Sequence, residues 1–341
     1  MEKGGRQTAV LLLNMGGPDS LDAVRPFLRN LFSDPAIVGI PALFRRPMAA
    51  MMSARRARKV RPRYELIGGK SPIGAITLAQ AKAVELALGP DFGPVLPAFS
   101  YWHPFVSDAV REASRSGAGS LVALSLYPQY CSATTGTCIK DVSMSLAGTP
   151  FENSSRIMDS WSTYPPYLDA LAATVDEALM RIPENLREDA VILFSAHGVP
   201  ESIIKGGDPY LEQTIGTVEG VMDRLAGRHY EIAFQSRLGP VKWLQPSLPD
   251  KLKELSARGS PPLVIVPVSF VSDHIETLYE LDIQHRDIAR ELGFTVYERA
   301  PALNTRPDFI AALADLVRSA APVREGERER GREGEGEGEE N

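Results

Sequence analysis

A histidine closes a strongly apolar run near the middle of the chain, in the stretch DAVILFSAHGVP at 189–200. The apolar residues Val191–Phe194, followed by small residues and glycine, indicate a central strand of a parallel sheet that runs into a loop. Ligands of open α/β sheets bind beyond the carboxyl ends of the strands, so His197 is predicted to lie in that loop, where chemistry takes place. The alternative for His197 is a local role, as a helix cap or in a backbone hydrogen bond that holds the loop.

A second polar stretch follows the apolar run Leu263–Val268 and opens a helical pattern. Asp273, Glu276 and Glu280 are spaced i, i+3 and i+7, which places three carboxylates on one face of a helix. His274 stands beside the first of them. The alternative is a capping box, in which Glu276 reaches back to the backbone amide at the start of the helix.

Both stretches follow predicted strands of the same half of the chain, so His197 and the acids could converge on one cleft. An imidazole beside carboxylates suits a borderline divalent metal such as Fe²⁺. The same groups suit proton abstraction, because a histidine with a pKa near neutrality is an effective base. The pattern therefore predicts a site for a divalent metal, for proton transfer, or for both.

Aromatic and amide side chains gather after other predicted strands, and together they could line a cleft for a large flat ring. They lie in YWH at 101–103, YPQY at 127–130 and QSRLGPVKW at 235–243. Each stretch alone is more typical of a core or a turn than of the wall of a binding site. Cys131 and Cys138 are predicted to share one loop and could be ligands, but two thiols do not hold an iron–sulfur cluster that needs four.

Strand-like and helical patterns alternate along the chain, which predicts parallel sheets with helices on both faces. The expected strands are Thr8–Asn14, Val95–Phe99, Ser120–Leu126, Arg156–Ser160, Ala190–Phe194, Tyr230–Phe234, Leu263–Val268 and Phe294–Glu298. The expected helices are Ser20–Phe32, Thr77–Leu88, Pro104–Ser116, Tyr167–Arg181, Pro209–Leu225, His274–Leu292 and Pro307–Ser319.

A faint internal repeat relates the two halves of the chain. The run VLLLNMGGP at 10–18 resembles VILFSAHGVP at 191–200 with one residue added. We therefore expect an α/β fold of two similar doubly wound, Rossmann-like domains whose parallel four-stranded sheets face a central cleft. The predicted domains are 1–165 and 166–322, and the last helix is expected to fold back over the first domain.

Composition limits the class of protein. The chain has 341 residues, of which 44% are hydrophobic, and no apolar run reaches the length of a membrane span. Two cysteines make no disulfide framework in a chain of this length, so a cytoplasmic location is expected.

No nucleotide motif is present, because MGGP at 15–18 is neither GxGxxG nor a P-loop. The Glu/Arg/Gly tail at 323–341 is predicted to be disordered.

The segment 35–64 differs from the rest of the chain in its local charge. It has eight basic residues from Arg45 to Arg63, no acidic residue between them, and the apolar run PMAAMM at 47–52. The charge fits an ordinary solvated helix face. It also fits an apolar lip with basic flanks that admits a flat hydrophobic ligand or rests, through 40–60, on a membrane surface. Nucleic acid is not expected as a partner, because the basic stretch is local and no binding motif accompanies it.

Five motifs carry a resemblance to a known family. They are LNMGGP at 13–18, LYPQY at 126–130 with TTG at 134–136, SAHG at 195–198, QS at 235–236 with GP at 239–240 and Trp243, and SDHIETLYELD at 272–282. From about Thr8 to about Ala320 the chain resembles the ferrochelatases, chelatases that insert Fe²⁺ into a porphyrin in haem synthesis. The resemblance is to bacterial members of the protoporphyrin type.

The resemblance implies roles for individual residues. The catalytic and metal-binding pair of that family falls on His197 and Glu276. Its acidic path, for metal entry or proton exit, falls on Asp273, His274 and Glu280. Its porphyrin-contacting positions fall on Met15, Tyr101, Tyr130 and Trp243.

The resemblance also bears on the substrate. Methionine at the position of Met15 is usual in members that use protoporphyrin IX, whereas the coproporphyrin-using branch usually has tyrosine there. Protoporphyrin IX is therefore the expected ring and coproporphyrin III the alternative. Ser100, Glu65 and Leu66 stand where some relatives have arginine, which puts the manner of propionate binding in doubt.

Two further alternatives stand beside an iron chelatase. One is a cobalt or nickel chelatase for a corrin-type ring, which would more typically present a histidine cluster where this chain has Glu276. The other is a haem- or porphyrin-binding protein without turnover. No cofactor is expected, since the terminal cysteines that hold a [2Fe–2S] cluster in some relatives are absent. A cytoplasmic enzyme at the inner face of a membrane is the expectation for location.

Overall fold

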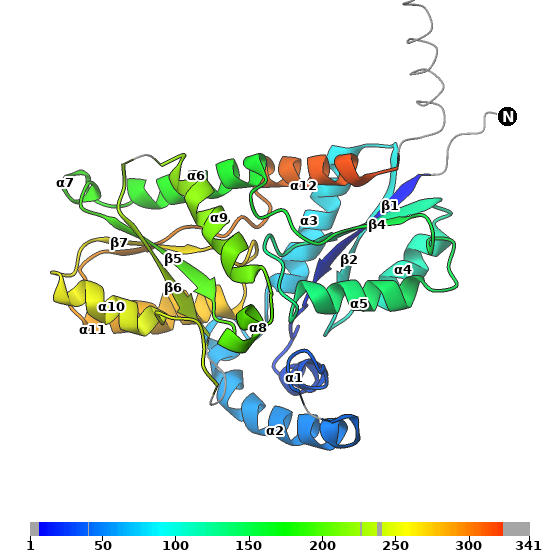
Figure 1. The fold of residues 1–341 in the computed structure, drawn as a ribbon, viewed down its shortest axis with the longest axis horizontal. Helices are drawn as coiled ribbons and strands as arrows, with labels where there is room; N and C mark the ends of the chain where they lie inside the picture. Colours follow the sequence, from blue (N-terminus) through cyan, green and yellow to red (C-terminus); the bar gives the residue numbers. More distant parts are fainter. Residues whose placement is uncertain (1–6, 40, 226, 237–240, 323–341) are drawn as a thin grey trace, which may run out of the picture.

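The computed structural model describes residues 7–39, 41–225, 227–236 and 241–322. The predicted disordered tail at 323–341 and the GP motif at 239–240 lie outside the described residues. In the described part of the chain, two four-stranded parallel sheets with flanking helices make up the fold (Figure 1). This confirms the expected α/β class.

The first half is built on a sheet with the strand order β2-β1-β3-β4. The central strand β1 is buried along its whole length, as expected of a continuous apolar run covered on both faces. The elements in chain order are β1 (Thr8–Asn14), α1 (Val24–Phe32), α2 (Ala42–Leu66), α3 (Ile73–Leu88), β2 (Phe92–Phe99), α4 (Val106–Arg115), β3 (Ser120–Ser125), α5 (Thr135–Leu146) and β4 (Ser155–Met158).

The second half repeats this topology with the order β6-β5-β7-β8, so β5 takes the central place of β1. The match of β1 to β5 is the one that the internal repeat predicts. The elements are α6 (Pro165–Met180), α7 (Glu184–Arg187), β5 (Val191–His197), α8 (Glu201–Lys205), α9 (Tyr210–Met222), β6 (Tyr230–Gln235), α10 (Leu248–Ala257), β7 (Leu263–Pro267), the π-helix η1 (Glu276–His285), α11 (Arg286–Glu291), β8 (Tyr297–Arg299) and α12 (Pro307–Ala320).

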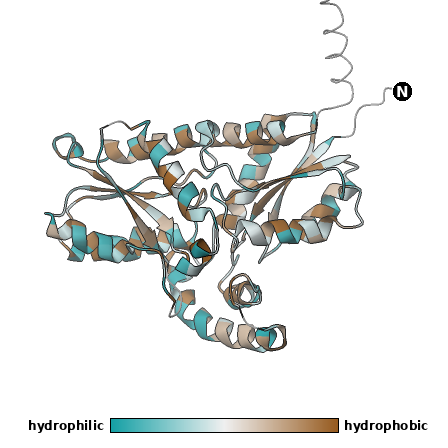
Figure 2. Cartoon of the chain, viewed as in Figure 1, coloured by the Kyte–Doolittle hydropathy of each residue, from teal (hydrophilic) through white to brown (hydrophobic). Residues whose placement is uncertain are grey.

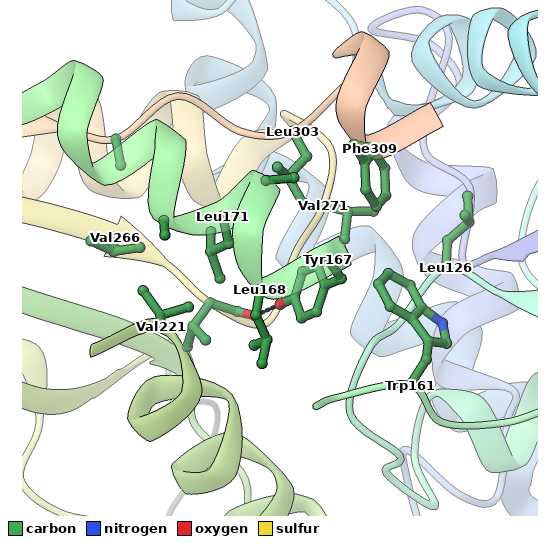
Figure 3. Close-up of a cluster of buried hydrophobic side chains, with 14 of the residues drawn as sticks. Leu126, Trp161, Tyr167, Leu168, Leu171, Val221, Val266, Val271, Leu303 and Phe309 are labelled. Atoms are coloured by element: carbon green, nitrogen blue, oxygen red, sulfur yellow. Dashed lines mark hydrogen bonds between the residues drawn. The ribbon is translucent and has the colours of Figure 1, made fainter. Parts of the chain in front are cut away.

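One hydrophobic core joins the two halves. It contains side chains of β1 and β3 together with those of β5 and β7, and α12 packs against both α3 and α6. Figure 3 shows its centre, where Trp161 meets Tyr167 edge-on with ring centroids 4.8 Å apart, and Phe309 of α12 lies beside Trp161 at 6.1 Å. The last helix therefore returns to the first half, as expected.

Some boundaries differ from the sequence expectations. The strand β5 continues to His197, which is its last residue and not the start of a loop. The strand β8 begins at Tyr297 and not at Phe294. Helices α5 and α10 were not expected; in α5 the buried residues Cys138, Val142 and Leu146 recur every four residues, but glycine and threonine obscure the pattern at its start. Cys138 thus lies in a helix and not in a loop.

The basic segment forms the long helix α2, which packs on α1 at one side of the body (Figure 1). Its contact with the body is narrow, because only Ala49, Ser53, Val60 and Tyr64 are buried. Much of the rest is solvated, and hydrophilic and weakly hydrophobic residues follow one another along it in Figure 2. No described helix combines the length and the apolar character that a membrane span requires.

Candidate active site

A cavity of about 820 Å³ lies between the two halves, within the usual range for ligand sites. Side chains of α1 and α2 line one side of it, and the ends of β5 and β6 and the start of η1 line another. Of the residues predicted to form the site, those that line the cavity are Met15, Tyr101, His197, Trp243, His274, Glu276 and Glu280. Tyr130 and Asp273 are not among its lining residues.

The backbone of β5 fixes His197 at the cavity wall. Its N–H donates to Ser269 Oγ at 3.0 Å, and its carbonyl accepts from the Tyr210 hydroxyl at 2.8 Å. The next residue has to be glycine, because a Cβ on Gly198 would lie 2.6 Å from the carbonyl oxygen of Gln235. The end of β5 is therefore held against β6, and the backbone of His197 has little freedom to move.

The imidazole makes a direct contact with the acidic helix. His197 Nδ1 lies 2.8 Å from Glu276 Oε2. The ring therefore pairs with a carboxylate and takes neither of the local roles considered as alternatives. Two groups that are far apart in sequence, one from a strand end and one from the first turn of η1, meet as the pattern predicts.

Ser236 connects this pair to the next carboxylate. Its hydroxyl lies 3.2 Å from Glu276 Oε2 and is also hydrogen-bonded to Glu280. A hydroxyl has one proton to donate, so contact with two carboxyl groups favours a state in which one of them carries a proton. Ser236 has a φ of 60°, a left-handed conformation that is uncommon for serine and typical of functional sites.

The charges of the cluster are strongly coupled. Burial lowers the pKa of His197, but the Glu276 carboxylate outweighs burial and the pKa is raised. Burial would raise the pKa of Glu276, but the adjacent His197 outweighs it and the pKa is lowered. Burial and the charge of Glu276 raise the pKa of Glu280 to about 7. The cluster can therefore hold and release protons near neutral pH.

His274 lies beside this cluster in a buried position. Its Nδ1 is 3.2 Å from the carbonyl oxygen of Ser272, and its Nε2 is 4.0 Å from Glu276 Oε2. Within the described residues, Nε2 has no hydrogen-bond partner. Burial lowers the pKa of His274, so the neutral ring is favoured. It is thus a second imidazole available at the cavity wall.

Asp273 does not join the other two carboxylates, so the prediction of three acids on one helix face is wrong. It precedes η1, and its side chain accepts hydrogen bonds from Thr277 and Asn304. The capping-box alternative is also wrong, because the N–H of Asp273, to which Glu276 would have to reach back, donates to Asn304 Oδ1 at 2.9 Å. The Glu276 side chain therefore forms no helix cap and lines the cavity.

The predicted porphyrin contacts divide into two groups. Met15, Tyr101 and Trp243 line the cavity, and the Tyr101 hydroxyl donates to Asp34 at 2.6 Å. Tyr130 is held elsewhere, with its backbone N–H bonded to Gln213 at 2.7 Å. The sequence carried no signal for Asp34, whereas Ser236 belonged to a recognised motif without an assigned role.

Within the described residues, no group of three or more histidine, cysteine, aspartate or glutamate side chains is arranged to hold a metal ion. Cys131 and Cys138 are both buried, and burial raises the pKa of each thiol to about 12. Neither is therefore a thiolate at neutral pH. His197 and Glu276 are the residues that could offer a nitrogen and an oxygen to a metal substrate.

Comparison with known proteins decides the family. The ferrochelatase family model matches residues 7–321. The chain is 48% identical over 316 residues to the ferrochelatase of Geotalea daltonii, which covers 92% of this chain and 98% of that protein. It is 41% identical over 320 residues to the ferrochelatase of Aquifex aeolicus, covering 94% and 99%. The chain belongs to the ferrochelatase family.

This ferrochelatase is a lyase of haem biosynthesis that acts on a porphyrin and ferrous iron. Its fold is similar to that of SirB from Bacillus subtilis with Fe³⁺, at a TM-score of 0.58 and 12% identity. That comparison covers 92% of this chain and 96% of the solved one, so the likeness of fold extends over both halves.

Proposed function

We propose that this ferrochelatase inserts Fe²⁺ into protoporphyrin IX and that His197 and Glu276 carry the reaction. The observation that supports this is the 2.8 Å contact between His197 Nδ1 and Glu276 Oε2 at the wall of a cavity large enough for a porphyrin. Insertion releases two protons from the pyrrole nitrogens while iron loses its water ligands. A base and a metal ligand are therefore needed at one point.

His197 acts as the base in this proposal. Its Nδ1 faces Glu276, so Nε2 is the nitrogen that accepts a pyrrole proton, and the carboxylate stabilises the imidazolium that forms. Glu276 then offers an oxygen to the arriving metal or passes the proton toward Ser236 and Glu280. The pKa of Glu280, about 7, suits a group that receives protons and returns them to solvent.

The choice of protoporphyrin IX rests on Met15, which lines the cavity with its apolar side chain. Protoporphyrin IX has two propionates where coproporphyrin III has four, so the apolar wall suits the former. Anaerobic turnover of Fe²⁺ with each porphyrin tests this, with Met15→Tyr as the comparison. We expect the wild type to turn over protoporphyrin IX faster than coproporphyrin III. We expect Met15→Tyr to turn over protoporphyrin IX more slowly than the wild type does. Turnover of coproporphyrin alone by the wild type would contradict the assignment.

We further propose that the enzyme uses no iron–sulfur cluster. The two cysteines of the chain are both buried, and clusters in proteins are commonly held by four thiolates. Protein purified without oxygen is expected to contain no acid-labile sulfide. Stoichiometric sulfide together with a charge-transfer absorption band would contradict this.

We also propose that the protein is cytoplasmic and makes a peripheral contact with the inner face of a membrane through α2. Leu43, Phe44 and Met51 are large apolar side chains exposed on it by 81%, 59% and 59%, among basic residues. Exposed apolar and basic side chains together favour an anionic lipid surface. We expect the wild type to sediment with anionic vesicles. We expect the double variant Leu43→Ser/Phe44→Ser to stay in solution. Equal sedimentation of the two proteins would contradict the contact.

A further inference from the structure

The carboxylate of Asp273 is turned away from the cavity and has a full set of partners. Its Oδ1 accepts from Thr277 Oγ1 at 2.9 Å and lies 3.2 Å from the Arg299 guanidinium. Its Oδ2 accepts from Asn304 Nδ2 at 2.8 Å, and its own N–H donates to Asn304 Oδ1 at 2.9 Å. A carboxylate held by three side-chain donors has little capacity left to carry a metal ion or a proton.

The same guanidinium also holds the middle of η1. Arg299 ends β8, its side chain is only 12% exposed, and its Nε donates to Asp282 Oδ1 at 2.8 Å. One arginine thus ties an acid that precedes the π-helix to an acid inside it. Charged hydrogen bonds of this kind are stronger than neutral ones and fix geometry well.

Asn304 extends this clamp to the other half of the molecule. Its φ is 44°, and its backbone N–H donates to the Val271 carbonyl at 2.8 Å. Its carbonyl accepts from Gln80 Nε2 of α3 at 2.7 Å, and Gln80 also donates to Ser272 Oγ at 3.1 Å. The start of η1 is therefore fixed both to α3 of the first half and to β8 of the second.

The clamp and the reactive groups lie on different sides of η1. Glu276, Glu280 and Gln284 line the cavity, whereas Thr277 and Asp282 do not. Any loosening of the clamp shifts or rotates the helix that presents Glu276 to His197. A displacement of about 1 Å at a reacting group can cost about 100-fold in rate.

We propose that Asp273, Arg299 and Asn304 are positioning residues that hold Glu276 against His197, and that Asp273 carries no ion itself. This inference rests on the proposed role of Glu276. It departs from the role that the family resemblance implies for Asp273, and it assigns a role to two residues that no motif singled out.

The test compares a positioning role with a path role by steady-state insertion of Zn²⁺, a metal that does not oxidise. Asn304→Gly keeps the left-handed backbone and removes both side-chain bonds to Asp273. Arg299→Met removes the guanidinium. Both are expected to lower kcat by about 10-fold or more, with the KM for Zn²⁺ within about twofold of wild type. Arg290→Gln, at an exposed ion pair in α11, is the control and should match wild type.

Asp273→Asn completes the comparison. A positioning role predicts that Asp273→Asn combined with Asn304→Gly loses no more kcat than the worse single variant, because the two share one contact. The inference fails if Asp273→Asn alone raises the KM for Zn²⁺ while Asn304→Gly and Arg299→Met behave as wild type. Glu276→Gln, assayed alongside, separates the claims: full activity there would contradict the proposed function itself. Thermal unfolding of each variant identifies any that fails to fold. Asn304→Gly is the least disruptive of these substitutions.

Discussion

At the scale of single residues, the site is a set of charges that determine one another's protonation. Glu276 keeps the pKa of His197 above its ordinary value although burial acts in the opposite direction. The resulting negative charge, together with burial, keeps a proton on Glu280 up to a pH of about 7. Ser236 links the two carboxyl groups. In the proposed reaction, a proton taken from the porphyrin enters a cluster whose next carboxyl group is already in contact and titrates near neutral pH.

This coupling predicts the effect of Glu276→Gln on His197. Without the Glu276 carboxylate, burial still lowers the pKa of His197 and only the charge of Glu280 opposes it, so the pKa of His197 should fall. Imidazole resonances followed by NMR against pH measure this shift without turnover, and His197→Ala identifies the signal. An unchanged pKa would show that the contact with Glu276 does not govern the protonation of His197.

At the scale of secondary-structure elements, the site depends on where a strand ends and where a helix begins. His197 is the last residue of β5, and Glu276 is the first residue of η1. Gly198 lets the end of β5 approach β6, because a side chain there would meet the backbone of Gln235. Close backbone contacts of this kind position a catalytic side chain more tightly than a surface loop can.

Gly198→Ala tests this positioning. The added methyl group must displace the Gln235 carbonyl, which lies 2.6 Å from its place, at a cost of about 1–3 kcal/mol in the free energy of unfolding. Iron insertion should fall with it, because the displaced strand ends carry His197 and Ser236. Gly74→Ala in α3 is the matched control; no atom lies within 4 Å of its added Cβ, so stability should be equal or higher by up to about 1 kcal/mol. Equal behaviour of the two variants would contradict the account.

Much of the secondary structure could be predicted from the sequence, and the predictions that failed did so for physical reasons. Apolar runs such as Thr8–Asn14 define buried parallel strands without ambiguity, and β1 has these bounds. The position of Asp273 could not be predicted, because an i, i+3 spacing places residues on one face only inside a regular helix, and η1 begins three residues later. Its partners Arg299 and Asn304 are distant in sequence and form no motif.

At the scale of the whole molecule, the two halves share one hydrophobic core beside the cavity, so we expect them to unfold as a single cooperative unit. Their sheets share one topology, yet the core runs continuously from β1 and β3 through α6 and α12 to β5 and β7. Halves that moved independently would not keep His197 and Met15 around the same cavity. The fold class and the repeat were predictable from alternating patterns, but the continuity of the core was not, because it arises from side chains of both halves packing together.

Phe309→Ala tests the cooperativity. Phe309 is fully buried in α12 beside Trp161, so its loss should cost about 3–5 kcal/mol. Differential scanning calorimetry should show one transition for the wild type and one, at lower temperature, for the variant. Two separated transitions, with only one shifted, would show that the halves unfold independently.

The central claim is that the pair formed by His197 and Glu276 carries out metal insertion inside the cavity. Anaerobic turnover of Fe²⁺ with protoporphyrin IX by wild type and His197→Ala, together with porphyrin binding measured by fluorescence, tests it most directly. We predict that His197→Ala binds the porphyrin with an affinity close to that of the wild type and loses haem formation by at least about 100-fold. Haem formation by His197→Ala at the wild-type rate would contradict the claim.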